Sequence, residues 1–476
     1  MSQLAALFSK LPNISRRTMK TATQNGVSSA ALGVSDSVRH TNAPKHSTAP
    51  SPLRKRSPKK PPSKSTHAPA RQTAPAAQTP PAHQTSRECV QEASTTLTIP
   101  CPDPTQEERI RDEHQNSALK LVRQEDWTKL SVLISAADRD NLMTPGGMSV
   151  AELMTFGARA DVVMAAEHAL LDRVPEHDAP LIRGIEALEY VLAEHADDYI
   201  IGCIVAHAHM DLAWAWRGIG WDVEIAPRNR EAFHAHFSRA RDIMQNFNGT
   251  MESSALLAAT SCALLRGHES TTKSVADKYE ALIDLNPVNT SPMRALGTHM
   301  LPRWYGSYEG LELEARRTAA RTQSIWGAGG YTWVMFDAIS HDDTACARVD
   351  LPFFIEGLRD IATRCRDPHT INLLAAYCAN TMGNAFSGND AADANRAQIA
   401  ECANWLVREH LTELHPMIWA HAAQGFVNNL RVASAHRFAA AGQDDALRII
   451  AGLFKGEIAD GKQIVFTDNG PIATPS

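Results

Sequence analysis

Apolar residues recur at intervals of three and four along most of the chain after residue 105. Val150, Leu153, Met154 and Met164 follow this spacing, which places them on one face of a helix. The body of this protein is therefore predicted to be an array of amphipathic helices. The expected helices cover residues 178–192, 199–217, 227–248, 251–266, 272–286, 307–325, 330–340, 350–366, 370–386, 390–414, 416–438 and 443–454.

Two further helix starts carry a capping signal. The sequences are Thr105-Gln-Glu-Glu108 and Ser149-Val-Ala-Glu152. In each, the hydroxyl can accept a hydrogen bond from the backbone amide three residues on, while the glutamate reaches back to the first residue. We therefore expect helices to begin directly after Thr105 and Ser149.

The breaks between the expected helices are short. They fall at Pro175, Pro287, Pro368 and Pro416, and short connections favour antiparallel neighbours. Two helices with their turns take about 35–45 residues, the size of a helical-repeat unit. The predicted fold class is all-α, an array of antiparallel helical hairpins, with one expected strand at 464–467.

Two stretches resemble known families. Residues 373–386 and 435–447 alternate small and aromatic residues and resemble tetratricopeptide repeats, although the strict period and full signature are missing. Residues 296–329, with Leu301-Pro-Arg-Trp-Tyr-Gly306, resemble a bacterial domain family of unknown function. The resemblance to tetratricopeptide repeats implies a TPR-like α-solenoid. Neither resemblance supplies a catalytic residue.

Charge divides the chain. Residues 1–87 hold fourteen Lys or Arg and one acid, Asp36, whereas the remainder holds 33 basic and 52 acidic residues. Residues 40–104 are rich in Pro, Ser, Thr and Ala, a composition typical of disorder. We therefore predict a disordered basic tail at 1–104, a helical-repeat body at 105–455, and a C-terminal extension at 456–476 that could be flexible.

The tail contains one dense basic patch. It consists of Arg54, Lys55, Arg56, Lys59 and Lys60. Such charge can bind nucleic acid phosphates, an acidic partner or an anionic membrane. The alternative is that the tail only keeps the protein in solution and tethers it.

The chain has eight cysteines and no Cys-x-x-Cys spacing, which favours free thiols in a reducing compartment. No apolar run reaches the ~18 residues of a membrane span, so we expect a cytoplasmic protein without a transmembrane segment.

Residues 1–20 interleave apolar and basic side chains. A targeting role for this segment stays open beside the interpretation as the start of a disordered tail.

The sequence His207-Ala-His209-Met-Asp211 resembles the metal motif of metallo-β-lactamase-type hydrolases, but Leu212 stands where a further His is expected. In a helix, positions two apart point about 200° apart, so His207 and His209 would diverge. His207, Asp211 and Trp214 would instead share one face. A metal-dependent hydrolase that uses His207, His209 and Asp211 is kept as the alternative function.

Arginines beside aromatic residues form a second candidate group. Such pairs are enriched at binding surfaces and can stack, although large side chains also pack helices together. The candidate binding residues are Trp214, Trp216, Arg217, Arg303, Trp304, Tyr305 and Tyr308.

The chain lacks a nucleophile elbow, a phosphate loop and a zinc-finger spacing, so we expect no cofactor. The leading prediction is a non-enzymatic scaffold that binds a protein or peptide along a concave face of stacked hairpins. The acidic body would favour a basic partner, with the chain's own tail among the candidates. A third possibility is an adaptor that the basic tail tethers to nucleic acid.

Overall fold

The computed structural model describes residues 96–171, 181–218, 225–247, 253–267, 272–426, 432 and 434–475. Within these ranges the chain is mostly helical, which confirms the all-α class. The basic patch at 54–60 and the predicted helix start at Asp178 lie outside the described residues.

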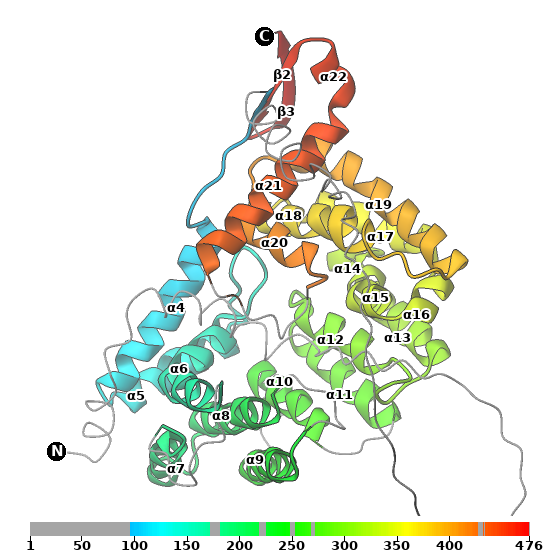
Figure 1. Ribbon diagram of the computed structural model, residues 1–476. Coiled ribbons are helices and arrows are strands. Elements are labelled where there is room, and N and C mark those ends of the chain that lie inside the picture. The colour runs from blue at the N-terminus through cyan, green and yellow to red at the C-terminus, as the bar shows by residue number, and fades with distance from the viewer. Residues whose placement is uncertain are drawn as a thin grey trace, which may run out of the picture.

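The first part of the chain forms helices that follow one another around the lower left of Figure 1. They are α4 (Gln106–Arg123), α5 (Trp127–Arg139), α6 (Val150–Leu171), α7 (Gly184–Glu194), α8 (Tyr199–Arg217), α9 (Pro227–Gln245) and α10 (Ala255–Ala263), which continues into the short 3-10 helix η2 (Leu264–Gly267).

The second part completes the outline. Its helices are α11 (Thr272–Leu285), α12 (Ser291–His299), α13 (Tyr308–Arg321), α14 (Gln323–Trp326), α15 (Gly329–His341), α16 (Asp343–Arg348), α17 (Leu351–Arg364), α18 (Pro368–Ala376), the π-helical η3 (Tyr377–Met382), α19 (Asp390–His410), α20 (Pro416–Ala423), α21 (Ala435–Leu453) and α22 (Lys455–Ala459).

Local signals fixed several helix ends correctly. The Thr105 hydroxyl accepts from the Glu108 amide at 3.2 Å, and the Glu108 carboxylate accepts from the Thr105 amide at 2.9 Å. The predicted capping box is therefore present. Helix α8 spans 199–217 as the sequence predicts, and the Asp198 carboxylate caps its first turn.

The predicted bounds of the helices 416–438 and 443–454 were wrong. Helix α20 ends at Ala423, and α21 runs unbroken through Gly442. A side chain at Gly442 would place its Cβ 2.3 Å from the carbonyl oxygen of Pro416. This glycine therefore permits close packing of α21 on α20 and does not end a helix. Helices α5 and α12 are absent from the predicted set, although Asp126 caps α5 and Pro292 stands in the first turn of α12.

The helices build two hydrophobic cores. One core gathers side chains from α4 to α10, among them Leu130, Ile201 and Phe237. The other extends from α10 to the C-terminal strands, with Trp333 and Trp419 fully buried in it. Helix α10 contributes to both cores, so it lies where they meet.

The two ends of the described chain are joined by a small sheet. Strand β1 (Leu97–Thr98) pairs in parallel with β2 (Lys462–Thr467), which pairs antiparallel with β3 (Gly470–Pro475). Leu97 and Ile464 are directly opposite each other and both are buried. In Figure 1 the blue segment at the start of the described chain lies beside β2 and β3.

Segments on both sides of the predicted helical body contribute to this sheet. Residues 96–104, assigned to the disordered tail, pack on the body, and the Leu414 amide donates to the Pro100 carbonyl at 2.8 Å. Residues 456–475, which could have been flexible, form α22 and the β2–β3 hairpin. Only 464–467 had been expected as a strand, because pairing between segments so far apart leaves no local signal.

The crossing of α12 and α15 depends on one small residue. A Cβ at Gly297 would lie 1.8 Å from the carbonyl oxygen of Val334. We expect Gly297→Ala to lower the free energy of unfolding by about 1–3 kcal/mol, as overpacking does. The matched control is Gly452→Ala on α21, where nothing lies within 4 Å. Urea unfolding of both variants checks the prediction, which fails if Gly297→Ala is as stable as the control.

Candidate functional site

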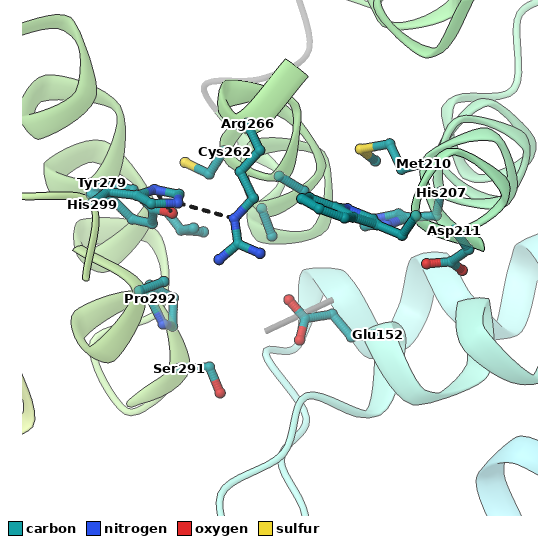
Figure 2. Close-up of a pocket in the computed structure, with 15 residues that line it drawn as sticks. Glu152, His207, Met210, Asp211, Cys262, Arg266, Tyr279, Ser291, Pro292 and His299 are labelled. Carbon is teal, nitrogen blue, oxygen red and sulfur yellow. Dashed lines mark hydrogen bonds between the residues drawn. The ribbon is translucent and has the colours of Figure 1, made fainter. Parts of the chain in front are cut away.

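A cavity of about 60 Å³ lies where the two cores meet. Its walls come from α6 and α8 on one side, from α11 and α12 on the other, and from α10 with η2 between them. Figure 2 shows the side chains that converge on it. The polar members are Glu152, His207, Asp211, Arg266, Tyr279, Ser291 and His299.

Helix α8 presents one row of side chains to the cavity. His207, Asp211 and Trp214 all line it, as their spacing of four and three residues predicts. The His207 Nε2 lies 3.1 Å from the hydroxyl of Thr260, and that hydroxyl donates to the Leu256 carbonyl at 2.8 Å. A hydroxyl has one hydrogen, so it must accept from His207 Nε2. Burial, and then the nearby Arg159, hold the pKa of His207 well below its usual range, so the ring is neutral.

Asp211 is already paired. The Arg159 Nε donates to its carboxylate at 2.6 Å, and the two side chains are 1% and 7% exposed. This pair joins α6 to α8 beside the cavity. A buried ion pair that loses one partner leaves an uncompensated charge, so the two groups hold each other in place.

His209 points away from His207. Its Nε2 lies 2.7 Å from the Glu189 carboxylate, and its Nδ1 lies 2.9 Å from Nδ1 of His236. Burial alone would raise the pKa of Glu189, but hydrogen bonds from Arg239 and His209 lower it to about 2. His209 is thus part of a separate polar cluster between α7, α8 and α9.

The structure therefore does not bring His207, His209 and Asp211 together. Successive residues of a helix turn by about 100°, which separates positions two apart. In the part of the chain that the structure describes, no group of three or more His, Cys, Asp or Glu side chains could hold a metal ion.

The opposite wall carries a chain of three polar groups. The Arg266 Nε donates to His299 Nε2 at 3.1 Å, and His299 Nδ1 lies 2.9 Å from the Tyr279 hydroxyl. Burial and then Arg266 hold the pKa of His299 well below its usual range. A neutral His299 that accepts at Nε2 carries its proton on Nδ1 and donates to Tyr279. The Tyr279 hydroxyl hydrogen is then left to donate elsewhere.

Arg266 brings a positive charge to this wall. Its guanidinium extends into the cavity in Figure 2, and the central carbon of the guanidinium, Cζ, lies 6.0 Å from the centre of the Trp214 ring. Among the described residues it forms no ion pair, and its one hydrogen bond goes through Nε to His299. Burial lowers the pKa of this guanidinium, which reflects the cost of keeping its charge out of water.

Glu152 faces Arg266 across the cavity (Figure 2). Burial raises the pKa of its carboxyl to about 7, against the attraction of Arg159 and with the repulsion of Asp138. The capping box expected at Ser149 is half formed. The Ser149 hydroxyl accepts from the Glu152 amide at 3.4 Å, whereas the Glu152 side chain turns to the cavity instead of reaching back.

Some of the candidate aromatic residues gather at this site. The Arg217 guanidinium lies 5.6 Å from the Trp214 ring, which lines the cavity. Trp304 and Tyr305 pack against His299, with ring centres 6.0 and 5.7 Å apart. They form the support behind His299 and do not line the cavity.

The remaining candidates lie elsewhere. Trp216 is buried and contacts Arg228, whose guanidinium lies 5.3 Å from its ring. Tyr308 begins α13 and lies under Arg348 at 5.0 Å. Arg303 lies between α12 and α13 and is half-buried. Of the seven predicted binding residues, only Trp214 lines the cavity, and Trp304 and Tyr305 support it through His299.

Sequence reasoning missed five of the polar groups, namely Glu152, Arg266, Tyr279, Ser291 and His299. The one available signal was an arginine directly after the apolar pair Leu264-Leu265. Cys262 also lines the cavity, but burial raises the pKa of its thiol to about 12, so it stays protonated and is a poor nucleophile. The arrangement is suited to hold a polar group.

Comparisons with protein-family models, with curated proteins and with solved structures find no match to this chain. Among the helices that the structure describes, none combines the length and the apolar character needed to cross a bilayer.

The position of Glu152 predicts a pH effect on stability. The folded protein retains this proton up to about pH 7, whereas an unfolded chain releases it near its ordinary value of 4.5. The folded state therefore binds more protons between these values, and stability falls as the pH rises from about 4.5 to 7. We expect Glu152→Gln to remove this part of the decline.

Thermal unfolding between pH 4.5 and 8 measures the difference. The variant should gain stability relative to the wild type as the pH rises through this window and then level off. Glu231→Gln removes an exposed carboxylate from α9 and controls for net charge. A constant difference between wild type and Glu152→Gln at all pH values would contradict the assignment.

Proposed function

We propose that this protein is a non-enzymatic binding protein whose helical hairpins stack in a TPR-like α-solenoid and that it holds a protein or peptide partner at the cavity. The supporting observation is the Arg266 guanidinium, which extends into the cavity without an ion pair to any described carboxylate. Arg266 is half-buried, and a cation partly withdrawn from water without a counter-charge is costly until a ligand compensates it. The cavity also lies between two hydrophobic cores, a common location for ligand sites.

Binding fits the chemistry of the cavity better than hydrolysis does. His207 is neutral and hydrogen-bonded to Thr260, Asp211 is paired with Arg159, and the Cys262 thiol is protonated. A metal-dependent hydrolase needs the three motif residues on one ion, and His209 lies in a different cluster. We therefore do not propose the hydrolase.

The order of helix packing supports the stacked arrangement. Helices that are close in chain order, though mostly not consecutive, pack on one another in the series α4–α6–α8–α9, α12–α15–α17 and α18–α20–α21. Figure 1 shows these helices following one another around the molecule. Stacked hairpins create extended surfaces on which a chain can lie.

Charge suggests how the partner approaches. Residues 88–476 carry 52 acids and 33 bases, so the body attracts basic segments over a distance. The partner would then combine basic residues on the acidic surface with one acidic group in the cavity. The tether to nucleic acid through the tail remains a prediction from the sequence, because Arg54, Lys55, Arg56, Lys59 and Lys60 lie outside the described residues.

Capture experiments with the full chain test this function. We expect Arg266→Met to lose proteins that the wild type retains, because the cavity charge would be gone. Arg139→Met is the matched control, since it removes an exposed arginine from α5. Quantitative mass spectrometry of both captures gives the measurement. If the wild type, Arg266→Met and Arg139→Met retain the same proteins in the same amounts, the cavity is not the binding site.

A further inference from the structure

We propose that the cavity binds a carboxylate group, which Arg266 and Tyr279 hold, and that Glu152 takes up a proton when this carboxylate enters. The inference deepens the proposed function and rests on it in one respect, namely that the cavity is the binding site. It adds the chemical class of the ligand and a dependence on pH.

Arg266 supplies the main attraction. Its Nε is occupied by His299, which leaves the two Nη groups, with four N–H donors, on the side of the cavity. A guanidinium presents its donors in a planar fork that matches the two oxygens of a carboxylate. A carboxylate bound there would also offset the cost of keeping this charge out of water.

Tyr279 supplies a second, oriented donor. His299 donates to the Tyr279 oxygen, as shown by its acceptance of the Arg266 hydrogen on the other nitrogen. The phenol hydrogen is therefore directed away from His299, and Tyr279 lines the cavity. Trp304 and Tyr305 pack on His299 and keep its ring in this orientation. The donors are thus in place before a ligand arrives.

Glu152 makes the site sensitive to pH. Its carboxyl faces Arg266 (Figure 2), so a ligand carboxylate beside Arg266 would lie next to it. Two ionised carboxylates in one site repel each other, and the pair is stable when one of them is protonated. Burial already raises the pKa of Glu152 to about 7, so this proton is available near neutral pH.

The other charged and titratable groups around Glu152 do not provide the same response. Arg159 on α6 and Asp211 on α8 are paired with each other. His207 and His299 are neutral, because burial holds their pKa values well below the usual range. The groups that act on or face Glu152 are Asp138 on α5, Arg159, His207, Asp211, Arg266 and Tyr279.

The size of the cavity limits what enters. Its volume of about 60 Å³ exceeds the ~10–15 Å³ that one water requires, so a carboxylate group fits and a large ligand does not. The rest of any larger ligand must extend outside. The carboxylate can come from a small free acid or from the end or an acidic side chain of a peptide.

Titration of the full chain with ¹³C-labelled acetate, followed by NMR, tests the site. We expect saturable binding that weakens about tenfold from pH 6 to pH 8, the change expected if Glu152 must hold a proton with a pKa of about 7. In Glu152→Gln the affinity should be independent of pH over this range. N-acetylglycine should bind and N-acetylglycinamide, which lacks the charge, should not.

Variants identify the donors. Arg266→Met should weaken acetate binding by about tenfold or more and Tyr279→Phe by roughly two- to tenfold, as expected for a charged and a single hydrogen bond. Arg139→Met on α5 should leave the affinity unchanged. Circular dichroism spectra that match the wild type show that a loss of binding is not a loss of fold.

Three results would overturn the proposal. They are the absence of saturable acetate binding, binding that Arg266→Met leaves intact, and a dependence on pH that persists in Glu152→Gln. If Arg266→Met changes the pH dependence of stability while acetate does not bind the wild type, Arg266 and Glu152 compensate each other's charge and the carboxylate site is disproved.

A peptide arm separates this inference from the proposed function. N-acetyl-triglycine and its amide carry the same chain with and without a terminal carboxylate. If N-acetyl-triglycine binds more tightly than acetate, the ligand of the site is the carboxylate of a peptide. Equal affinities assign it to a small acid, which supports the site and contradicts a peptide partner at the cavity. If protein capture depends on Arg266 but acetate does not bind, the proposed binding of a protein partner is supported and the proposed carboxylate site is contradicted.

Discussion

The buried ion pair between Arg159 and Asp211 fixes the relation of α6 and α8, and the cavity depends on it. Removing either charge would leave the other uncompensated in a region from which water is excluded. The same guanidinium attracts the Glu152 carboxylate and disfavours a proton on His207. This one interaction therefore joins two helices and also acts on the groups that they present, although burial is the main cause of the protonation states of Glu152 and His207.

The opposite wall differs because its cation has no such partner among the described residues. Arg266 is held at Nε by a neutral histidine, which fixes the direction of the guanidinium without compensating its charge. The cavity thus has one wall whose charges are balanced and one wall that is electrostatically incomplete. An anionic group would therefore bind on the side of Arg266. This difference between the walls is the physical basis of both the proposed function and the carboxylate site.

The sequence predicts the parts of this molecule that local interactions determine. Thr105 and Pro227 mark helix starts because caps and prolines act within one turn, and the row His207, Asp211, Trp214 follows from helical geometry. Strand β1 and the positions of Arg266 and His299 could not be predicted, because they depend on contacts between distant segments. Glu152 was assigned to a cap, since the sequence cannot show that its side chain turns toward another helix.

Contacts between the two ends of the described chain affect how firmly the walls of the cavity are held. Besides the β1–β2 pairing, the Arg111 Nη2 of α4 lies 3.2 Å from His369 Nε2 of α18. Buried Glu107 accepts from Arg111, from Thr144 and from the Gly146 amide. The β1–β2 pairing and the Arg111–His369 contact tie the start of the chain to the C-terminal core, and Glu107 holds Arg111 in place, so these contacts oppose separation of the two cores. A cavity held between them keeps its donors in position, and a ligand that enters spends less of its binding free energy on ordering the protein.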